Sequence, residues 1–329
     1  MEPGKVLGGA GPKAKASPKK VWIDGELVDF ASAKIHVLSH SLHYGVGAFE
    51  GIRAYETSEG GAVFRLRDHL NRLFESARVY YMPIPLSMAE VEQGVIEAQM
   101  ANGILPSYIR PIVYRGDPVL GVKNTEGKVS VAIGVIPASQ YLGPESQRGV
   151  RAKISPFRKP RSDGIPSFTK MTGNYVSGYF AGVEAHLDGY DEAILLDGNG
   201  FVAEGTGENV FLVRDGTLYT PGLESDILLG ITRDTVIQIA KEMGISVVER
   251  LISVNELLGA DEAFFSGTYA EIAPIREIGH ISVGDACPGP ITKEIMARYS
   301  RIVRGGDPSH RSWLTPLRSN TKKVAPTTA

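Results

Sequence analysis

A chain of 329 residues is long enough to bury a sizeable core, either in one large domain or in two medium ones. Its 35 basic and 37 acidic residues nearly cancel, so the composition gives no electrostatic footprint for nucleic acid or for an anionic membrane. No stretch is long and apolar enough to span a bilayer, and the single cysteine, Cys287, cannot form an intrachain disulfide, which together favour a cytoplasmic protein.

The two ends of the chain differ in composition from the rest. Residues 1–20 are rich in Gly, Pro, Ala and Lys and predict a disordered leader. A transit peptide is the alternative, but this segment has no Arg and carries Glu2. Residues 318–329 are expected to form a polar tail.

Residues 21–137 predict a small α/β domain. Its first signal is Asp24-Gly25 between two apolar runs, which is typical of a hairpin. Ser87 and Glu90 are spaced for a capping box at a helix start, and Gly103 is placed to end that helix. The expected elements are strands at 43–55 and 63–66, helices at 67–81 and 87–102, and strands at 108–114 and 129–136.

Residues 138–149 are turn-rich and predict an interdomain loop before a large domain at 150–317. The expected elements of that domain are a helix at 176–186, strands at 192–196 and 209–213, a helix at 232–243 and a strand at 262–266. No internal repeat is present. The pattern indicates an α+β fold of two domains, with mixed sheets and flanking helices.

Two glycine motifs resemble the start of a dinucleotide-binding fingerprint. They are Gly45-Val46-Gly47 and Gly205-Thr206-Gly207. Neither has the third glycine in place, and each runs into a segment typical of a strand, whereas the fingerprint needs a helix N-terminus to hold a pyrophosphate. We therefore reject a dinucleotide site.

His36, His40 and His43 have a spacing that would suit metal ligands on a helix. The segment is expected to be a loop that runs into a strand, and no Cys or carboxylate close in sequence completes a ligand shell. A structural role is therefore favoured over a metal site.

Lys170 lies in the segment SFTKMTGNY. An average lysine is a solvated surface charge. Here the neighbouring residues are apolar or small, and a helix is expected to start just after Asn174. Burial lowers the pKa of a lysine and makes its amine nucleophilic, which Schiff-base chemistry requires. The context therefore favours a reactive lysine.

Glu204 follows an apolar strand and stands on a glycine-flanked turn. A poorly solvated carboxylate needs a cationic partner, and a protonated pyridine nitrogen is one. A turn carboxylate that faces water is an equally good interpretation of the local sequence. Further along, Thr232 is near the start of a helix, where free N–H groups can bind a phosphate, although plain N-capping by Thr232 is the simpler interpretation. Ser266-Gly267-Thr268 offers similar donors at the end of a strand.

Together these segments resemble the class IV aminotransferases of the pyridoxal-phosphate fold type IV, and among them the branched-chain amino acid aminotransferases. The resemblance runs from about Val21 to Leu317. Seven motifs carry it, in the order of the family: HSLHYGVGAFEGIRAY, FRLRDHLNRL, SYIRP, TKMTGNY, EGTGENVF, GITRD and SGTYAEI.

The resemblance implies transamination of leucine, isoleucine and valine with 2-oxoglutarate, through a Schiff base between Lys170 and pyridoxal 5′-phosphate, in a homodimer or a higher homo-oligomer with no metal. Tyr175 would hydrogen-bond the phenolic oxygen of the cofactor, Glu204 its pyridine nitrogen and Arg72 its phosphate. The full set of implied cofactor residues is Arg72, Lys170, Tyr175, Glu204, Gly207, Leu228, Ile231, Thr232 and Thr268. The implied substrate residues are Tyr44, Phe49, Tyr108, Arg110, Tyr141, Thr268 and Tyr269.

The sequence departs from the family pattern at two places. Tyr269 stands where the family usually has a small residue. The stretch before Tyr141 lacks a tryptophan that close relatives are expected to have, which implies a more open pocket.

Other functions share parts of this pattern. A D-amino acid aminotransferase and an aminodeoxychorismate lyase of the same fold share the lysine and the glutamate. The resemblance associates the D-specific enzymes with an Arg-x-His pair, whereas here Arg110 is followed by Pro111 and Ile112. A non-catalytic binding protein on the same scaffold is disfavoured because Lys170, Glu204 and Arg72 are all in place.

Overall fold

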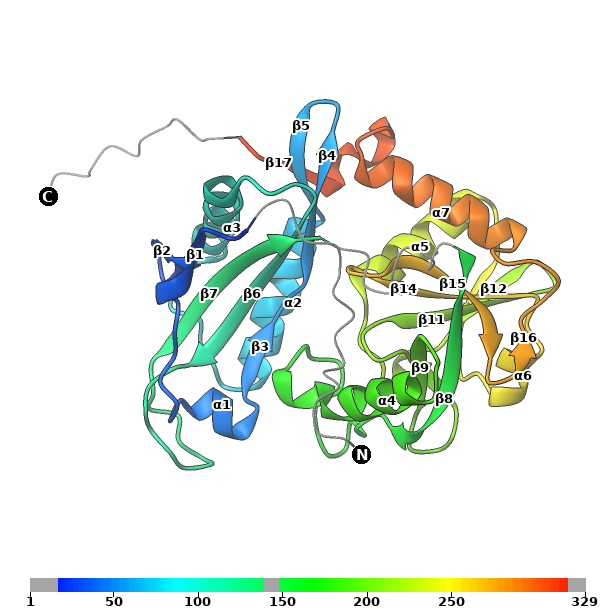
Figure 1. Ribbon diagram of the computed structural model, residues 1–329, viewed down its shortest axis with the longest axis horizontal. Helices are drawn as coiled ribbons and strands as arrows, with labels where there is room; N and C mark the ends of the chain where they lie inside the picture. The colour runs from blue at the N-terminus through cyan, green and yellow to red at the C-terminus, as the bar shows by residue number, and fades with distance from the viewer. Residues whose placement is uncertain (1–16, 139–147, 319–329) are drawn as a thin grey trace, which may run out of the picture.

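The computed structural model describes residues 17–138 and 148–318 (Figure 1). The predicted leader up to residue 16, Tyr141 and the predicted tail from residue 319 lie outside the described residues. Among the helices that the structure describes, none combines the length and apolar character needed to cross a membrane.

The first sheet is antiparallel throughout and is drawn on the left of Figure 1. Its strands follow the order β17-β5-β4-β6-β7-β1-β2, and β3 pairs with β6. The strands are β1 (Lys20–Ile23), β2 (Glu26–Asp29), β3 (Gly47–Phe49), β4 (Ile52–Thr57), β5 (Gly60–Phe64), β6 (Ser107–Arg115), β7 (Val129–Pro137) and β17 (Leu314–Pro316).

Three helices belong to this part of the chain: α1 (His40–Tyr44), α2 (Leu66–Val79) and α3 (Met88–Asn102). The helices α2 and α3 pack on each other and cover the sheet, and their buried leucines and valines join its core. The contact between α3 and β1 is close at Gly94, where an added Cβ would lie 2.6 Å from the Trp22 ring. A side chain at residue 94 would therefore force the helix away from the sheet.

The second sheet is mixed, because β8 runs parallel to both β9 and β15 and β12 runs parallel to β13. Its order is β10-β9-β8-β15-β14-β11-β12-β13, and β16 pairs with β15. The strands are β8 (Val150–Arg158), β9 (Glu192–Leu196), β10 (Val202–Glu204), β11 (Asn209–Arg214), β12 (Thr217–Thr220), β13 (Val247–Glu249), β14 (Glu262–Gly267), β15 (Glu271–Ile278) and β16 (Ile281–Ser282).

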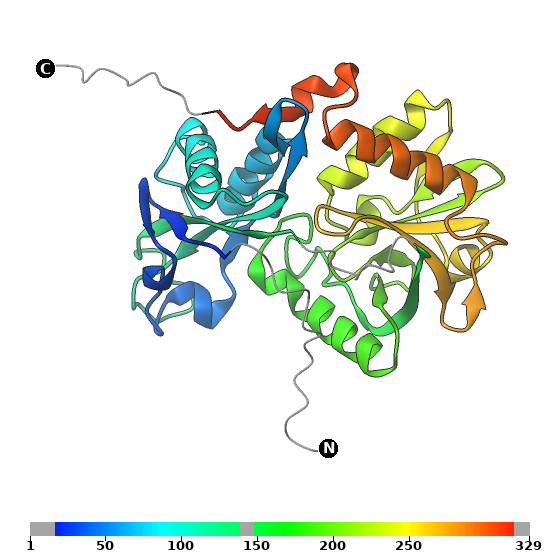
Figure 2. The same cartoon turned by 45° about the horizontal axis from the view of Figure 1, so that its top comes forward.

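Helices cover both faces of the second sheet. Figure 2 shows α4 on one side and α5 and α7 on the other. The helices are α4 (Val176–Leu187), α5 (Ile231–Glu242), α6 (Val254–Leu258) and α7 (Pro290–Val303), with a 3-10 turn at Thr172–Tyr175 ahead of α4.

The two sheets are joined by shared core and backbone contacts. Tyr55 and Phe64 of the first sheet pack in one buried cluster with Phe211 and Tyr299 of the second half. The last strand, β17, returns to pair with β5 of the first sheet. These contacts hold the two halves of the chain together.

Most of the expected elements are confirmed, as is the α+β fold. The hairpin at Asp24-Gly25 has both residues at positive φ, 48° and 103°. The capping box of α3 is present in full, and Gly103 ends that helix in the left-handed conformation. The helices α2, α4 and α5 begin and end within one or two residues of the predicted limits.

The single strand expected at 43–55 is wrong. The structure has α1, β3 and β4 over this stretch, because Gly45 ends α1 with φ 65° and the chain leaves the sheet between Phe49 and Ile52. Consequently His40 and His43 lie on a short helix and not on a loop. Their rings bond backbone oxygens, and no group of three metal-ligating side chains occurs within the described ranges.

Candidate active site

Lys170 is placed by backbone contacts with the first half of the chain. Its carbonyl accepts a hydrogen bond from Phe49 N at 3.0 Å, and its N–H donates to Ser76 Oγ at 3.0 Å. The next residue, Met171, forms a β-bridge with Ala48. The sequence of α2 and β3 therefore fixes the position of a lysine that comes much later in the chain.

The amine of Lys170 is half-buried and lies between aromatic rings and among other charges. Burial, together with the charge of Arg72, lowers the pKa of Lys170 to about 7. The Nζ atom donates to Tyr175 Oη at 2.5 Å and lies 5.0 Å from the centre of the Phe49 ring. Burial also raises the pKa of Tyr175 above its ordinary value, so the phenol stays neutral. A lowered pKa leaves more of this amine unprotonated at neutral pH than in an ordinary lysine.

A pocket opens beside this amine and collects most of the predicted residues. Its lining combines β6, the turn after β10, the start of α5 and the end of β14. The lining residues are Gly51, Arg72, Tyr108, Lys170, Gly207, Asn209, Leu228, Gly230, Ile231, Thr232, Ser266, Gly267, Thr268 and Tyr269.

One side of the pocket presents free hydrogen-bond donors. Gly230 is the N-cap of α5 and has no side-chain capping bond, so the first N–H groups of the helix face the pocket. A Cβ at this position would lie 2.1 Å from Asn209 Oδ1, so a larger residue would displace the Asn209 side chain, which bonds Glu204. The buried Ser266 Oγ has no hydrogen-bond partner within the described structure. Because Gly230 is the N-cap, the expectation that Thr232 caps this helix is wrong. The free donors suit a phosphate.

Arg72 is held on the same side by a buried carboxylate. Its Nε donates to Glu50 Oε1 at 2.6 Å and its Nη2 to Glu50 Oε2 at 2.9 Å. His69 Nδ1 lies 2.8 Å from the same carboxylate. Burial alone would raise the pKa of the Glu50 carboxyl, but Arg72 and His69 hold it well below its usual range. The guanidinium is therefore oriented before any ligand binds, because Nη1 also donates to Leu229 O at 2.8 Å.

Glu204 ends β10 and is buried, so the interpretation as a carboxylate facing water is wrong. Its Oε2 accepts from Asn209 Nδ2 at 3.1 Å and from Leu228 N at 2.9 Å. Its Oε1 lies 2.6 Å from Lys159 Nζ. A buried carboxylate in this setting is a fitting partner for a protonated ring nitrogen.

The predicted substrate residues are only partly brought together. Arg110 Nη2 donates to Tyr108 Oη at 3.0 Å, and its guanidinium lies 4.7 Å from the centre of the Phe49 ring. The Tyr269 ring packs on Tyr108 with 4.6 Å between centroids. Tyr44 lies outside this group, since its hydroxyl accepts a hydrogen bond from Gly121 N.

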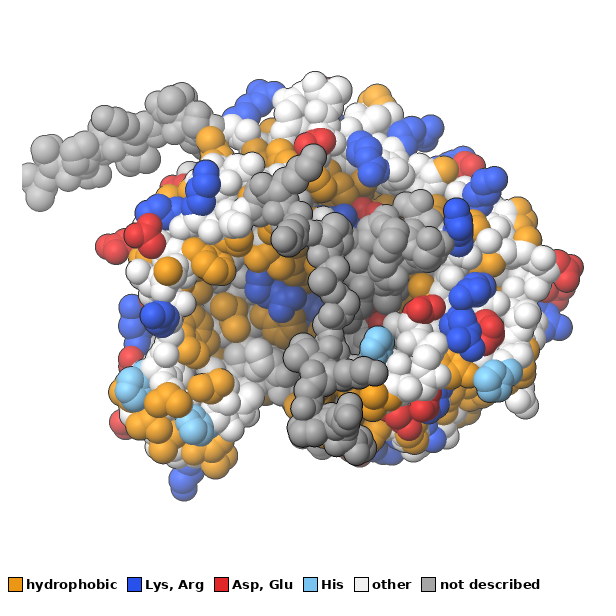
Figure 3. Space-filling view, in the orientation of Figure 1, with side chains coloured by type: hydrophobic (Ala, Val, Ile, Leu, Met, Phe, Trp, Pro, Cys, Tyr) orange, Lys and Arg blue, Asp and Glu red, His pale blue; other side chains and the backbone are white. Residues whose placement is uncertain are grey.

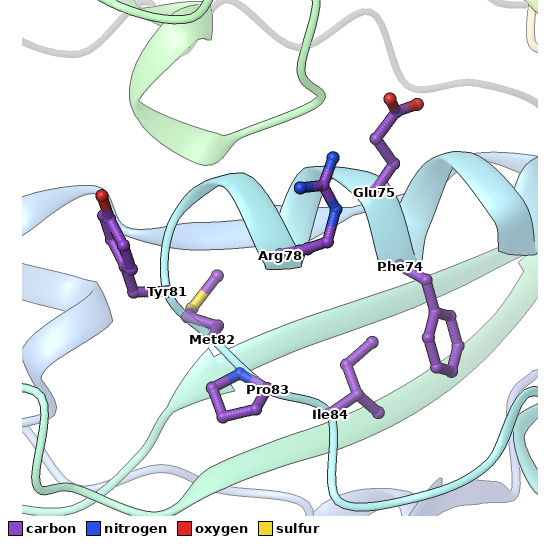
Figure 4. A pocket seen from close by; sticks show the side chains of 7 residues that line it. All are labelled: Phe74, Glu75, Arg78, Tyr81, Met82, Pro83 and Ile84. Atoms are coloured by element: carbon purple, nitrogen blue, oxygen red, sulfur yellow. The ribbon is translucent and has the colours of Figure 1, made fainter.

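A second hollow lies away from these residues (Figure 4). It is lined by the C-terminal end of α2 and the segment that follows, with Phe74, Met82 and Ile84 on its apolar side and Glu75 and Arg78 above. None of the predicted site residues lines it. The chemistry is therefore concentrated in the pocket beside Lys170.

The prediction from sequence missed three contributors to the site: Glu50, Asn209 and Lys159. Glu50 and Asn209 lie inside quoted motifs, and a charged residue between two apolar strands was a usable signal for Glu50. Lys159 stands in a basic run with no local signal.

Fold and site together define a class of enzyme. The family described as amino-transferase class IV matches residues 47–278. The chain therefore belongs to the class IV aminotransferases.

Within this class the chain is similar to enzymes of one kind. It is 42% identical over 301 residues to a branched-chain-amino-acid aminotransferase of Salmonella typhimurium, which covers 91% of this chain and 97% of the relative. It resembles the crystal structure of a branched-chain aminotransferase from Thermoproteus uzoniensis with norvaline, with a TM-score of 0.88, 47% identity, and coverage of 91% and 99%. It also resembles the branched-chain amino acid aminotransferase from Thermobaculum terrenum in its PLP-form, with a TM-score of 0.86, 36% identity, and coverage of 92% and 100%.

The cofactor of the family is pyridoxal 5′-phosphate, and the residues present here fit it. The uncapped start of α5, Arg72 and the unpartnered Ser266 hydroxyl suit the phosphate. Lys170 offers the amine, and the buried Glu204 carboxylate offers an acceptor for the ring nitrogen.

Proposed function

We propose that this protein transfers the amino group of L-leucine, L-isoleucine and L-valine to 2-oxoglutarate, with Lys170 as the residue that carries pyridoxal 5′-phosphate. The observation that carries the proposal is the half-buried amine of Lys170, whose pKa is lowered to about 7 and which lines one pocket with the uncapped start of α5. The substrate class rests on the named relatives and on the apolar surroundings of the amine, where the Phe49 ring lies 5.0 Å away.

The cofactor would be held at three points. Arg72, Ile231, Thr232 and Thr268 would bind the phosphate, Tyr175 the phenolic oxygen and Glu204 the ring nitrogen, while Gly207 and Leu228 line the same pocket. When bound, pyridoxal 5′-phosphate supplies the electron sink for the electron pair left on the substrate Cα. An ionised Glu204 favours a protonated ring nitrogen, which strengthens that sink.

Lys170 would also move the proton. With substrate and cofactor bound, the free amine of Lys170 would take the proton from the substrate Cα and hold it for return to the product. A pKa of about 7 suits this exchange, because both protonation states are then accessible near neutral pH. Tyr175, which accepts a hydrogen bond from Nζ, would keep the amine aligned.

Arg110 would let one pocket serve two kinds of side chain. Leucine needs an apolar surface, whereas the carboxylate of glutamate would be stranded there without a donor. Arg110 lies exposed at the pocket rim, against Phe49 and Tyr108, and no carboxylate among the described residues forms a salt bridge with it. It is therefore available to bind the distal carboxylate of glutamate or 2-oxoglutarate.

We further propose a homodimer. Figure 3 shows hydrophobic side chains gathered at the corner formed by α1, and exposed apolar residues there include Val37, Leu42 and Val122. An apolar surface of this kind is typical of an interaction site. Tyr44 belongs to the same helix, so it would serve a site only where subunits meet.

A division into two domains at 138–149 and a cytoplasmic location also stay proposals. The two sheets support the first, and the single Cys287 supports the second.

The competing reactions of the fold are not favoured. A D-amino acid aminotransferase or an aminodeoxychorismate lyase would share Lys170 and Glu204, but the relatives named above are branched-chain aminotransferases. No nucleic acid or membrane partner is proposed, and amino acids and 2-oxo acids are the expected small molecules.

The test is replacement of the lysine. Lys170→Ala should retain the fold but lose the absorbance of covalently held cofactor and lose turnover of L-leucine with 2-oxoglutarate by about 10³-fold or more. The circular dichroism spectrum serves as the control for folding. Near-wild-type turnover of the variant without added amine would overturn the assignment.

A further inference from the structure

The two oxygens of the Glu204 carboxylate have different partners. Oε2 accepts hydrogen bonds from Asn209 Nδ2 and Leu228 N, at 3.1 and 2.9 Å. Oε1 is left to Lys159, whose Nζ lies 2.6 Å away. Asn209 and Leu228 are neutral donors that orient the carboxylate through Oε2. The charged amine of Lys159 contacts the other oxygen, Oε1.

Lys159 is not a surface lysine. It directly follows β8, and its backbone N–H donates to Leu196 O at 2.9 Å, which anchors it beside β9. Both side chains of the pair are only 10% exposed. An exposed pair of this kind would contribute little, but a buried one is strongly coupled, because loss of either partner leaves an uncompensated charge.

We propose that Lys159 is a positioning residue for the ring-nitrogen carboxylate: it keeps Glu204 ionised and oriented, so that the ring nitrogen of the bound cofactor carries the proton. This inference rests on the role of Glu204 in the proposed function. It adds that the electron sink of the enzyme depends on a lysine that touches neither substrate nor cofactor.

The ring nitrogen of the bound cofactor and the Glu204 carboxylate would compete for one proton. The proton can lie on the ring nitrogen, which leaves Glu204 negative, or on Glu204, which leaves both groups neutral. A cation in direct contact with the carboxylate stabilises the negative form most strongly, because the Coulomb energy falls with distance. Without Lys159, burial would favour the neutral carboxylic acid, and the proton would leave the ring nitrogen.

The direct readout is the nitrogen-15 chemical shift of labelled pyridoxal 5′-phosphate bound to the protein, which separates a protonated from an unprotonated ring nitrogen. Lys159→Gln keeps a hydrogen-bond donor but removes the charge, and Lys159→Met removes both. In both variants the shift should move toward the unprotonated value, kcat should fall about tenfold, and KM for L-leucine should change by about twofold or less.

Two matched variants serve as controls. Lys159→Arg keeps the charge and should restore the wild-type shift and kcat. Lys153→Gln removes a lysine within β8 that pairs at the surface with Glu184 and Asp188, and this change should alter neither the shift nor kcat. A wild-type shift and kcat in Lys159→Gln would overturn the proposal even if the protein became less stable, because the lysine would then be purely structural.

Glu204→Gln separates this proposal from the one on which it rests. If Glu204→Gln keeps the wild-type shift, Glu204 is not the partner of the ring nitrogen and both proposals fail. If Glu204→Gln moves the shift but neither Lys159→Gln nor Lys159→Met does, only the role of Lys159 fails. The double variant should match Glu204→Gln alone, since Lys159 acts through that carboxylate; an additional loss of kcat would contradict this route.

Discussion

At the scale of single residues, the site is a set of buried charges that depend on one another. Burial and the charge of Arg72 lower the pKa of Lys170 to about 7, while Arg72 itself forms an ion pair with Glu50. A buried charge without a partner costs several kcal/mol, so each of these groups constrains the next. The lowered pKa of Lys170 is therefore a property of this group of charges and not of the lysine alone.

The lowered pKa of Lys170 predicts how the apo-protein takes up its cofactor as the pH changes. With a pKa of about 7, the free amine fraction should rise about fivefold between pH 6 and pH 7 and level off above about pH 8. The rate of cofactor uptake, followed by absorbance, should have the same profile. A rate that continues to rise about tenfold per pH unit up to pH 10 would instead indicate an ordinary lysine.

The lowered pKa of Lys170 also makes the free energy of unfolding depend on pH. Since the folded pKa lies below the ordinary value of 10.5, the unfolded chain binds more protons than the folded chain between about pH 7 and that value. The contribution of Lys170 to the free energy of unfolding of the apo-protein should therefore rise with pH across this window.

Arg110 carries the prediction on dual specificity. Arg110→Met should raise KM for 2-oxoglutarate and L-glutamate about tenfold or more, because their distal carboxylate loses a charged partner, and should leave L-leucine nearly unchanged. Half-reaction kinetics with each amino acid measure this directly. Arg67→Met, at an exposed arginine of α2, serves as the control. Equal losses for leucine and glutamate would mean that Arg110 supports the whole site.

The motifs that carry the family resemblance predicted site residues that lie close together in the chain. Lys170 and Tyr175 are five positions apart in one motif, and the structure brings their side chains to 2.5 Å. The pairs of Glu50 with Arg72 and of Glu204 with Lys159 could not be predicted in the same way, because each joins two elements that only the tertiary fold brings together.

At the scale of elements, the sequence predicted a structure correctly where all of its stabilising contacts lie within a few neighbouring residues. The capping box of α3 joins Ser87 and Glu90 within one turn, so the sequence alone located it. The stretch 43–55 failed for the opposite reason. Its apolar residues suit a strand, but Gly45 ends a short helix that contacts with β6 help to stabilise, and no local pattern reveals those contacts.

The α3 capping box gives a prediction on stability. Ser87→Ala removes the acceptor for Glu90 N and should lower the free energy of unfolding by about 1 kcal/mol, with no change in turnover. Urea denaturation measures the first quantity. Ser58→Ala, at a turn serine, is the matched control and should change the free energy of unfolding by less than about 0.5 kcal/mol. Equal values for the two variants would show that the cap contributes nothing.

At the scale of the whole molecule, the site exists because two sheets meet. The first sheet and α2 supply Phe49, Arg72 and Tyr108, and the second half supplies Lys170 and the start of α5. The bridge between Ala48 and Met171 joins the two halves close to the amine. The composition and the order of elements predicted an α+β fold, but the return of β17 to the first sheet was not predicted, because three residues carry no pattern of their own.

The most direct test of the account mixes the cofactor-loaded protein with L-leucine in the absence of 2-oxoglutarate and measures the 2-oxo acid formed by mass spectrometry. We predict no more than one equivalent of the 2-oxo acid of leucine per bound cofactor, followed by continuous formation of that acid and of L-glutamate once 2-oxoglutarate is added. D-leucine should give none, and Lys170→Ala should give none with either enantiomer. A failure of L-leucine to yield its 2-oxo acid, or equal yields from the two enantiomers, would contradict the proposed transamination of branched-chain L-amino acids.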